Sequence, residues 1–339
     1  MTLRLGLLAA GFGGLFLAGV LGFILVPLLT KVNFVQTIRN NGPAWHSDKN
    51  GTPTMGGLML LIGSLTSLLL PYLALTKQVP EMNEAHWQQA GKGMMIAVVF
   101  AVINGAIGFF DDFIKVIKKR NKGFSIIPKL LLQMVVVAVF LIVLQQNAML
   151  TTVVQLPLFG MVDFGFLFYP LSYILILAII NGVNFTDGID GLATSVTFLV
   201  MIGYLVICSF LGWYDLGLFA AALAGSCTGF LLWNFYPAKI FMGDTGSLFL
   251  GGAVVGIAFC MGHPELLLIL GFIYLVEASS VLLQVLWFRI TKGKRLFKMT
   301  PLHHHFELSG WSEVKITTWF SVVMVVCVAI AFIFAYSTY

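Results

Sequence analysis

Charged side chains are scarce in this chain and make up only 10% of its 339 residues. Soluble globular proteins carry roughly 25% charged residues, so this composition excludes a cytosolic enzyme of ordinary design. Hydrophobic residues account for 59% of the chain, and the mean hydropathy is +0.97. Most of the chain is therefore expected to have lipid as its solvent.

Cysteine is also rare. The four cysteines, Cys208, Cys227, Cys260 and Cys327, all lie in apolar stretches, and no two have C-x-x-C spacing. This pattern excludes disulfide scaffolds and zinc ribbons. Glycine and proline form no runs, which excludes collagen-like and low-complexity segments. The first apolar run extends to about Thr30 and is too long for a signal-peptide core, so we interpret it as a retained helix.

Long apolar stretches recur along the chain, and a helix of about 20 apolar residues is long enough to cross a bilayer. They lie at about 5–30, 56–75, 94–110, 128–145, 166–183, 192–210, 216–235, 248–262, 264–288 and 314–336. The sequence therefore predicts an all-α, polytopic integral membrane protein with about ten transmembrane helices, forming a single transmembrane domain over residues 1–339. An even number of spans places both termini on the same side of the membrane.

Basic residues indicate the orientation. Lysine and arginine collect in cytoplasmic loops. Of the 19 basic residues, all except Arg4, Lys77 and Lys92 lie in or beside the loops at about 31–55, 111–127, 184–191, 236–247 and 289–313. These five loops are predicted to face the cytoplasm, with both termini outside. The net charge of +5 thus reflects topology and does not indicate a nucleic-acid partner.

Two small-residue motifs permit close helix packing. They are Gly225-x-x-x-Gly229 and Gly252-x-x-x-Gly256. We expect them to pack within the monomer, and a homodimer interface is the alternative.

Five aspartates fall in the predicted cytoplasmic loops: Asp111, Asp112, Asp187, Asp190 and Asp244. A charge at the bilayer boundary is costly unless it is paired, hydrated or bound to a cation. Their gathering on one face predicts an active site on the cytoplasmic side.

Asp111 and Asp112 follow the third apolar stretch directly. One interpretation pairs them with Lys115, at i+4 and i+3 on a helix. The other rests on the mutual repulsion of two ionised carboxylates, which favours a shared proton or a divalent cation. The second interpretation fits a general base beside a metal ligand.

Two further segments combine polar residues with glycine. Asn184, Asp187 and Asp190 would share one face of a helix, whereas the intervening glycines would instead permit tight turns. Thr186 or Asp187 as the N-cap of the sixth helix is the simpler alternative. Asp244 or Thr245 is similarly placed to cap the eighth helix, although the same helix start also suits phosphate and Mg²⁺.

Lys49 and a histidine run complete the set of candidates. Lys49 precedes a glycine-rich turn and is suited to contact a phosphate, although topology alone also explains a lysine there. His303, His304 and His305 stand together in the last predicted loop. Three histidines can bind a transition metal, but the nearby acids suit a harder cation, so we prefer hydrogen bonding of the histidines to a substrate phosphate or sugar.

The candidate residues together indicate phosphoryl transfer between a water-soluble and a lipid-soluble reactant. The aspartates suit Mg²⁺, the lysine and histidines suit phosphate, and all of them are predicted at one membrane face.

Five segments together resemble the phospho-N-acetylmuramoyl-pentapeptide-transferase (MraY) family, within the polyprenyl-phosphate N-acetylhexosamine-1-phosphate transferase superfamily. They are Lys49-x-Gly-Thr-Pro-Thr-Met-Gly-Gly, Gly108-Phe-x-Asp-Asp-Phe-x-Lys115, Asn184-x-Thr-Asp-Gly-x-Asp-Gly-Leu192, Asn234 through Phe241-Met-Gly-Asp-Thr-Gly-Ser247, and Pro301-Leu-His-His-His-Phe-Glu307. They occur in order between about residues 39 and 313.

The resemblance implies Mg²⁺-dependent transfer of phospho-MurNAc-pentapeptide from UDP-MurNAc-pentapeptide to undecaprenyl phosphate, giving lipid I and UMP, in the bacterial cytoplasmic (inner) membrane. It implies catalytic roles for Asp111, Asp112, Asp244 and His303, with Asp244 on the metal. It places Lys49, Lys115, Asn184, Asp187, Asn234, Phe241, Gln284, His304 and His305 at the substrate, Phe241 being suited to stack on uracil. The ninth helix, with Glu277, would be bent beside a lipid groove.

Two alternative functions are compatible with part of this pattern. A polyprenyl-phosphate GlcNAc-1-phosphate transferase would keep the aspartates but lack Pro301-Leu-His-His-His. A cation-coupled transporter would place acids near mid-bilayer, where only Glu277 is expected. The sequence leaves open whether an aspartate attacks phosphorus or deprotonates the lipid phosphate.

Overall fold

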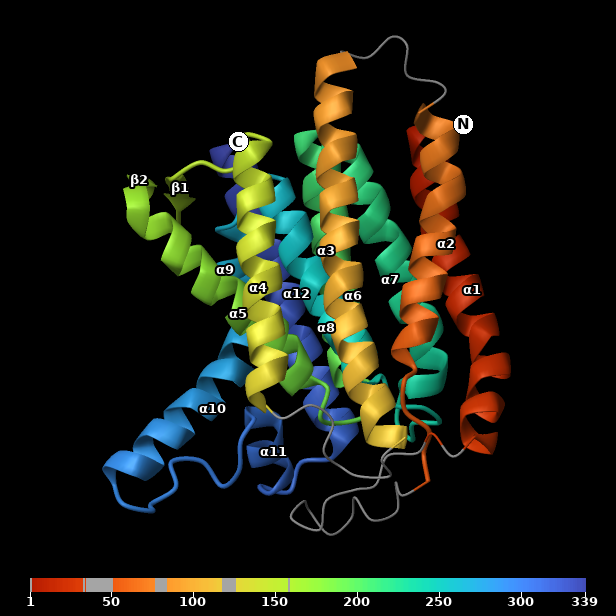
Figure 1. The fold of residues 1–339 in the computed structure, drawn as a ribbon, viewed down its shortest axis with the longest axis vertical. Coiled ribbons are helices and arrows are strands. Elements are labelled where there is room, and N and C mark those ends of the chain that lie inside the picture. Colours follow the sequence, from red (N-terminus) through yellow and green to blue (C-terminus); the bar gives the residue numbers. More distant parts are fainter. Residues whose placement is uncertain (1, 33, 35–50, 77–83, 118–125, 158) are drawn as a thin grey trace.

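The computed structural model describes residues 2–32, 34, 51–76, 84–117, 126–157 and 159–339. In this part of the chain, ten helices are long and apolar enough to cross a membrane (Figure 1). They are α1 (Leu3–Lys31), α2 (Gly57–Thr76), α3 (Glu84–Ile117), α4 (Ile126–Gln146), α5 (Phe168–Thr186), α6 (Leu192–Leu211), α7 (Tyr214–Asn234), α8 (Gly243–Cys260), α10 (Phe272–Ile290) and α12 (Glu313–Thr338). The predicted all-α architecture with ten spans is confirmed.

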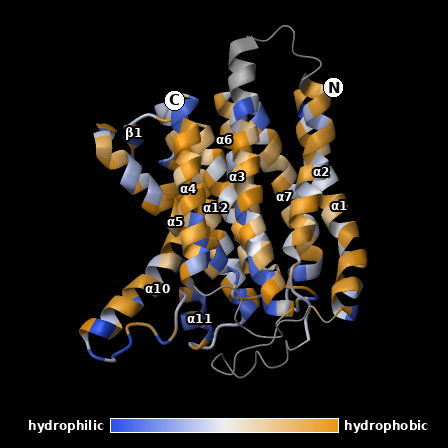
Figure 2. Cartoon of the chain, viewed as in Figure 1, coloured by the Kyte–Doolittle hydropathy of each residue, from blue (hydrophilic) through white to orange (hydrophobic). Residues whose placement is uncertain are grey.

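The outer surface of the bundle is apolar. Hydrophobic residues cover most of the length of the helices, and hydrophilic ones gather toward their ends (Figure 2). On α1, for example, the side chains of Phe12 and Phe23 are 67% and 71% exposed. Such exposure is unfavourable in water but suits contact with lipid tails. The helices therefore form a bundle whose surrounding solvent is the bilayer.

Helix α8 lies at the centre of the bundle and packs against α2, α3 and α5. Glycines allow the close approach: a Cβ added to Gly252 would lie 2.9 Å from the Cα of Ala101 on α3. The other small-residue motif brings α7 against α1, where a Cβ added to Gly225 would meet the carbonyl oxygen of Gly11 at 1.8 Å. Packing of these motifs within the monomer is thus confirmed, and a homodimer stays a prediction.

The ninth span is interrupted. A short helix, α9 (Leu266–Leu270), is followed by Gly271, and α10 begins at the next residue. Helix α10 then inclines away from the rest of the bundle (Figure 1). The bend that the resemblance implied for this span is therefore present.

Several helices extend beyond the predicted boundaries. Helix α3 continues to Ile117, α5 continues to Thr186, and α8 begins at Gly243. An apolar stretch stops at the first polar residue, whereas a helix backbone continues into the polar boundary of the membrane, so these helices run past the approximate apolar limits. Asp111, Asp112, Asn184 and Asp244 accordingly lie on helix ends, and the predicted loops at 111–127, 184–191 and 236–247 are shorter.

Four smaller elements were not predicted. Strands β1 (Val153–Leu156) and β2 (Gly160–Asp163) form an antiparallel hairpin, followed by the 3₁₀ turn η2 (Gly165–Leu167). A short helix, α11 (Leu302–Glu307), carries the histidine run. The two ends of the chain lie at one end of the bundle, and α11 lies at the other (Figure 1).

Candidate active site

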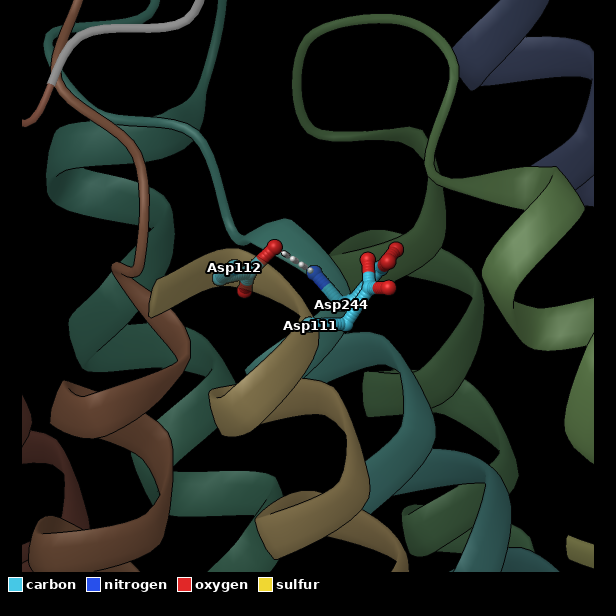
Figure 3. Close-up of side chains that lie close together, drawn as sticks. All are labelled: Asp111, Asp112 and Asp244. Carbon is cyan, nitrogen blue, oxygen red and sulfur yellow. Dashed lines mark hydrogen bonds between the residues drawn. The ribbon is translucent and has the colours of Figure 1, made fainter. Parts of the chain in front are cut away.

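Three aspartates meet where α3 and α8 touch. Asp111 and Asp112 come from the last turns of α3, and Asp244 comes from the first turn of α8 (Figure 3). One carboxylate oxygen from each lies within 4.8 Å of the others. Asp111 and Asp112 are each 2% exposed, and the Asp244 side chain is 16% exposed. We call these three residues the acidic cluster.

Glycines bring the two helices into backbone contact beside the acidic cluster. A Cβ added to Gly108 would lie 2.0 Å from the carbonyl oxygen of Asp244. On the neighbouring helix, a Cβ added to Gly57 would lie 2.1 Å from the backbone nitrogen of Gly246. Any larger side chain at these positions would separate the helices that hold the carboxylates.

Asp112 caps helix α8 from a different helix. Its Oδ1 accepts the backbone N–H of Asp244 at 3.2 Å, and its Oδ2 accepts the backbone N–H and the hydroxyl of Thr245 at 2.8 and 2.7 Å. The first N–H groups of a helix have no partner within it, and a carboxylate satisfies them well. The interpretation of Asp244 or Thr245 as the N-cap was therefore wrong, because both lie inside the first turn and the acceptor comes from α3.

Two lysines pair with the acidic cluster. The Lys115 ammonium lies 2.5 Å from Asp111 Oδ2, 2.6 Å from Asp244 Oδ2 and 3.4 Å from Asp112 Oδ1. Lys129 adds a second ammonium, 2.9 Å from Asp244 Oδ2. The pairing of Lys115 with its own helix, expected as the simpler interpretation, is present, but Lys115 also reaches Asp244 on α8.

Lys129 was counted among the basic residues that indicate orientation but was not predicted as a site residue. Lys129 stands in the first turn of α4. A cation is unfavourable there because helix N-termini carry partial positive charge. That misplaced charge was the available signal that Lys129 has a partner elsewhere, which the structure shows to be Asp244.

Asn184 completes the surroundings of Asp244. Its amide nitrogen donates to Asp244 Oδ1 at 2.7 Å and to Ser247 Oγ at 2.8 Å. The Ser247 hydroxyl donates in turn to the Gly243 carbonyl, and this bond holds the Ser247 side chain against the first turn of α8. Ser247 was not predicted as a site residue, although it ends the quoted Phe241–Ser247 segment.

The segment after α5 folds as turns. Thr186 is the last residue of α5, Asp187 follows it, and Gly191 precedes α6 with a φ of 73°. Neither Thr186 nor Asp187 caps α6, so that interpretation was wrong, and the alternative of glycine-permitted turns is confirmed. The Asp190 carboxylate accepts the Ala238 N–H at 2.9 Å and thereby joins this turn to the segment before α8.

Asp187 lies close to the acidic cluster but outside the helices. Desolvation by the surrounding protein, followed by the charges of Asp244 and Asp112, raises the pKa of Asp187 well above its usual range. Its side chain nevertheless retains some contact with solvent. The site therefore has a fourth carboxyl group at its edge, which binds a proton more tightly than a free aspartate does.

The histidine run is anchored by a buried glutamate. Glu277 of α10 is 0% exposed, and its carboxylate accepts the backbone N–H groups of Leu302 and His303 at 2.7 and 3.2 Å. The His303 ring is also fully buried, with Nδ1 3.3 Å from Glu277 Oε2. A Cβ added to Gly188 would lie 2.1 Å from His303 Nε2, so the ring packs on the turn that carries Asp187.

The next two histidines are only partly buried. His304 Nδ1 lies 2.6 Å from Glu307 Oε2, and His305 Nδ1 accepts the Lys298 backbone N–H at 3.1 Å. The structure thus brings α11 beside the Asp187 turn through His303, while His304 and His305 lie nearer the surface.

The predicted nucleotide-side residues mainly hold loops. Asn234 is 3% exposed; its amide oxygen accepts the Thr194 hydroxyl, and its nitrogen donates to the Ile240 carbonyl. Gln284 accepts the backbone N–H groups of Leu296 and Phe297. Lys49 lies outside the described residues.

Phe241 connects two of the quoted motifs. Its backbone N–H donates to the Pro53 carbonyl at 2.8 Å, and its carbonyl accepts the Gly56 N–H at 2.9 Å. These bonds hold the segment before α2 against the segment before α8, and the Phe241 side chain stays partly exposed.

Comparison with known proteins identifies the family. The model of glycosyl transferase family 4 matches residues 94–262, and signature 1 of phospho-N-acetylmuramoyl-pentapeptide-transferase matches residues 49–61. A phospho-N-acetylmuramoyl-pentapeptide-transferase of Acetivibrio thermocellus is 43% identical over 91% of this chain and 89% of its own length. The chain belongs to the phospho-N-acetylmuramoyl-pentapeptide-transferase family.

Further relatives of this transferase carry the same name. One from Caldicellulosiruptor bescii is 41% identical over 91% of this chain and 92% of its own length, and one from Clostridium perfringens strain 13 is 42% identical over 93% and 94%. The protein is thus a multi-pass membrane transferase, which disfavours the transporter. The family 4 match contains the whole acidic cluster, whereas α11 lies beyond it.

Proposed function

We propose that this transferase moves phospho-N-acetylmuramoyl-pentapeptide from UDP-MurNAc-pentapeptide to undecaprenyl phosphate, giving lipid I and UMP, in the bacterial cytoplasmic membrane. The relatives' shared name gives the reaction its class. The observation that carries the proposal is the meeting of the acidic cluster with Lys115 and Lys129 at one end of a membrane bundle. Carboxylates and ammonium groups at a lipid boundary suit a reaction between two phosphorylated substrates.

The donor atoms of the site fit Mg²⁺. The carboxylates of the acidic cluster and the Ser247 hydroxyl are oxygen donors, which Mg²⁺ prefers, and no cysteine lies among them. Asp244 is proposed as the protein's metal ligand, because its carboxylate is more exposed than those of Asp111 and Asp112. The bound cation would neutralise charge on the phosphate being transferred.

The two neighbouring aspartates are assigned different tasks. The carboxylate of Asp112 accepts three hydrogen bonds from the start of α8, which favours a positioning role. Asp111 takes no part in that cap and is proposed as the base that receives the proton of the lipid phosphate. Lys115 would then bind phosphate oxygens when the substrate separates it from the carboxylates.

The remaining predicted residues are proposed to shape the substrate cleft. Asn184 and Asp187 would border the metal, and Phe241 would stack on uracil. Lys49 would contact phosphate. Asn234 and Gln284 would act by holding the loops beside the nucleotide, since their amides are bonded within the protein. His303, which the resemblance placed among the catalytic residues, is fully buried against Glu277, so we propose that it supports the Asp187 turn. His304 and His305 would face the sugar or phosphate.

A radiolabel assay with the purified protein tests the proposal. UDP-MurNAc-pentapeptide and undecaprenyl phosphate should give lipid I and UMP only when Mg²⁺ is supplied, and UDP-GlcNAc should not be consumed. Exchange of labelled UMP into UDP-MurNAc-pentapeptide without the lipid would favour a phosphoryl-enzyme over direct attack. Near-normal activity of Asp244→Asn at ordinary Mg²⁺ would contradict the metal assignment. Efficient use of UDP-GlcNAc would contradict the substrate.

A further inference from the structure

An apolar groove lies on the lipid-facing surface between α1 and α7, on the opposite side of the bundle from α10 (Figure 1). Its volume is about 320 Å³. One wall is formed by α1, including Phe16, Val20 and Phe23, and the other by Leu232 and Trp233 at the end of α7. Lys239, on the segment that leads to α8, is the one charged residue among the described residues that line it.

Trp233 gives the groove a fixed shape. Its indole N–H donates to the Gly19 carbonyl at 2.9 Å, and the Phe23 ring meets it edge-on with centroids 4.8 Å apart. The indole fits against α1 only because position 22 has no side chain: a Cβ added to Gly22 would lie 2.1 Å from the Trp233 Nε1. The indole therefore fixes how α7 packs on α1 at this depth, and the groove is part of the fold.

Trp233 also positions the charge at the mouth of the groove. The Lys239 backbone N–H donates to the Trp233 carbonyl at 2.7 Å. The Lys239 ammonium lies 5.4 Å from the centroid of the Trp233 ring, a cation–π distance. Lys239 follows the end of α7 on the same side as the start of α8, so the ammonium lies at the membrane boundary that also holds the acidic cluster.

We propose that this groove binds one anionic phospholipid from the leaflet on the active-site side. One acyl chain lies along the apolar wall of α1, and the headgroup phosphate pairs with Lys239. The groove matches both parts of such a lipid, because its lining is apolar at the depth of the acyl chains and carries a positive charge at the depth of the phosphates. A zwitterionic lipid would bring its own cation beside Lys239 and so bind less well. This proposal is independent of the transfer reaction.

Native mass spectrometry of the full chain in detergent tests the site. The protein is titrated with dioleoyl phosphatidylglycerol or, separately, with dioleoyl phosphatidylcholine. Wild type should retain one phosphatidylglycerol about 5-fold more tightly than phosphatidylcholine, which is the effect of one lysine at an anionic surface. Lys239→Gln should remove this preference and leave phosphatidylcholine binding unchanged.

Two further variants locate the site. Arg289→Gln removes a basic residue from the last turn of α10, across the molecule, and should keep the preference. Val20→Trp fills the groove from a position that is 39% exposed and should weaken both lipids. Because Lys239 is exposed, Lys239→Gln decides the proposal even where Val20→Trp does not fold.

Three results would overturn the proposal. The first is equal binding of the two lipids by wild type, and the second is an unchanged preference in Lys239→Gln. The third is a dimer that Val20→Trp dissociates without any change in lipid binding, since the groove would then be covered by a second copy of the chain.

Discussion

Asp111 and Asp112 are adjacent in the sequence and equally buried, and both lie near Lys115, but only Asp112 caps α8. The Asp112 carboxylate accepts three hydrogen bonds from the first turn of α8, whereas Asp111 pairs with Lys115. Successive residues on a helix point about 100° apart, so two neighbours face different elements. The two neighbours can therefore have different roles, and we propose a positioning role for Asp112 and a chemical role for Asp111.

Asparagine substitutions should separate these two roles. Asp111→Asn should lower turnover at least about 10²-fold, because an amide cannot accept the proton, and should leave the thermal midpoint in detergent near that of wild type. Asp112→Asn should lower turnover to a similar extent and also lower the thermal midpoint. Both carboxylate oxygens of Asp112 accept hydrogen bonds from α8, an amide nitrogen cannot accept one, and a hydrogen bond to a charged group contributes about 1.5–3 kcal/mol. Turnover and the thermal midpoint, followed by tryptophan fluorescence, are measured for both variants. Normal stability of Asp112→Asn would contradict the capping role.

The histidines of α11 should affect substrate use without affecting the metal. His304→Ala and His305→Ala should each weaken transfer from UDP-MurNAc-pentapeptide, and extra Mg²⁺ should not restore it, because neither ring lies in the acidic cluster. Initial rates at several Mg²⁺ concentrations give the comparison, with wild type on UDP-GlcNAc as the negative control. Full activity of a variant with all three histidines replaced by alanine would exclude this role.

At the scale of helices, the site depends on how closely α3 and α8 approach. The contact is made by Gly108 against the Asp244 backbone, with no side chain between them. Gly93 lies on the same helix, and a Cβ added there would meet the Cys260 carbonyl at 3.4 Å, which is close to ordinary contact. Substitutions at Gly108 and Gly93 therefore test whether the close contact between α3 and α8 is required, with Gly93 as the control.

Gly108→Ala should destabilise the protein and reduce transfer together. The added methyl group must push α3 from α8, and overpacking of this kind costs about 1–3 kcal/mol. Gly93→Ala should change both quantities little. Thermal unfolding and turnover, measured on the same preparations, check the prediction. Equal behaviour of the two variants would show that the closeness of the helices at Gly108 is not required.

Helix α11 depends on one buried carboxylate for its position. Glu277→Leu should leave the Leu302 and His303 N–H groups without acceptors, at about 1–3 kcal/mol for each buried group. We expect a lower thermal midpoint and faster proteolysis within residues 291–301, with Glu277→Gln intermediate. Ser280→Ala is the control, since the Ser280 hydroxyl bonds only within its own helix. Wild-type proteolysis of Glu277→Leu would exclude the anchoring role.

The helices and the meeting of the aspartates could be predicted from local patterns. Apolar length identifies a span, and topology brings Asp111, Asp112 and Asp244 to one face. The cap on α8 could not be predicted, because its acceptor lies more than 130 residues before its donors. The partner of Glu277 was equally inaccessible, since a buried acid in an apolar helix does not reveal which segment it binds.

At the scale of the whole molecule, the bundle has two unlike ends. The chain termini and the β1–β2 hairpin lie at one end, and α11 lies at the other with the connections around the site (Figure 1). The asymmetry of lysine and arginine predicts which end faces the cytoplasm, and this assignment can be tested directly.

Single cysteines in a background without the four native cysteines should report the orientation. Lys294→Cys, on the connection between α10 and α11, should react with an impermeant thiol reagent only in inverted vesicles. Gln146→Cys, at the opposite end of α4, should react only in intact cells, and both positions are exposed. Both termini would then lie outside. Labelling of Lys294→Cys from outside intact cells would reverse the topology.

The burial of α8 has a consequence for how the protein is made. Helix α8 is 89% buried and, with α10, has the lowest hydropathy of the ten spans, 1.4 against 2.6 for α4. It carries Asp244, and little of its surface can contact lipid in the folded protein. The helices that surround it most, α2, α3 and α5, all precede it in the chain. These three helices leave the ribosome before α8, so the acidic cluster can form only after α8 has been made and packed against them.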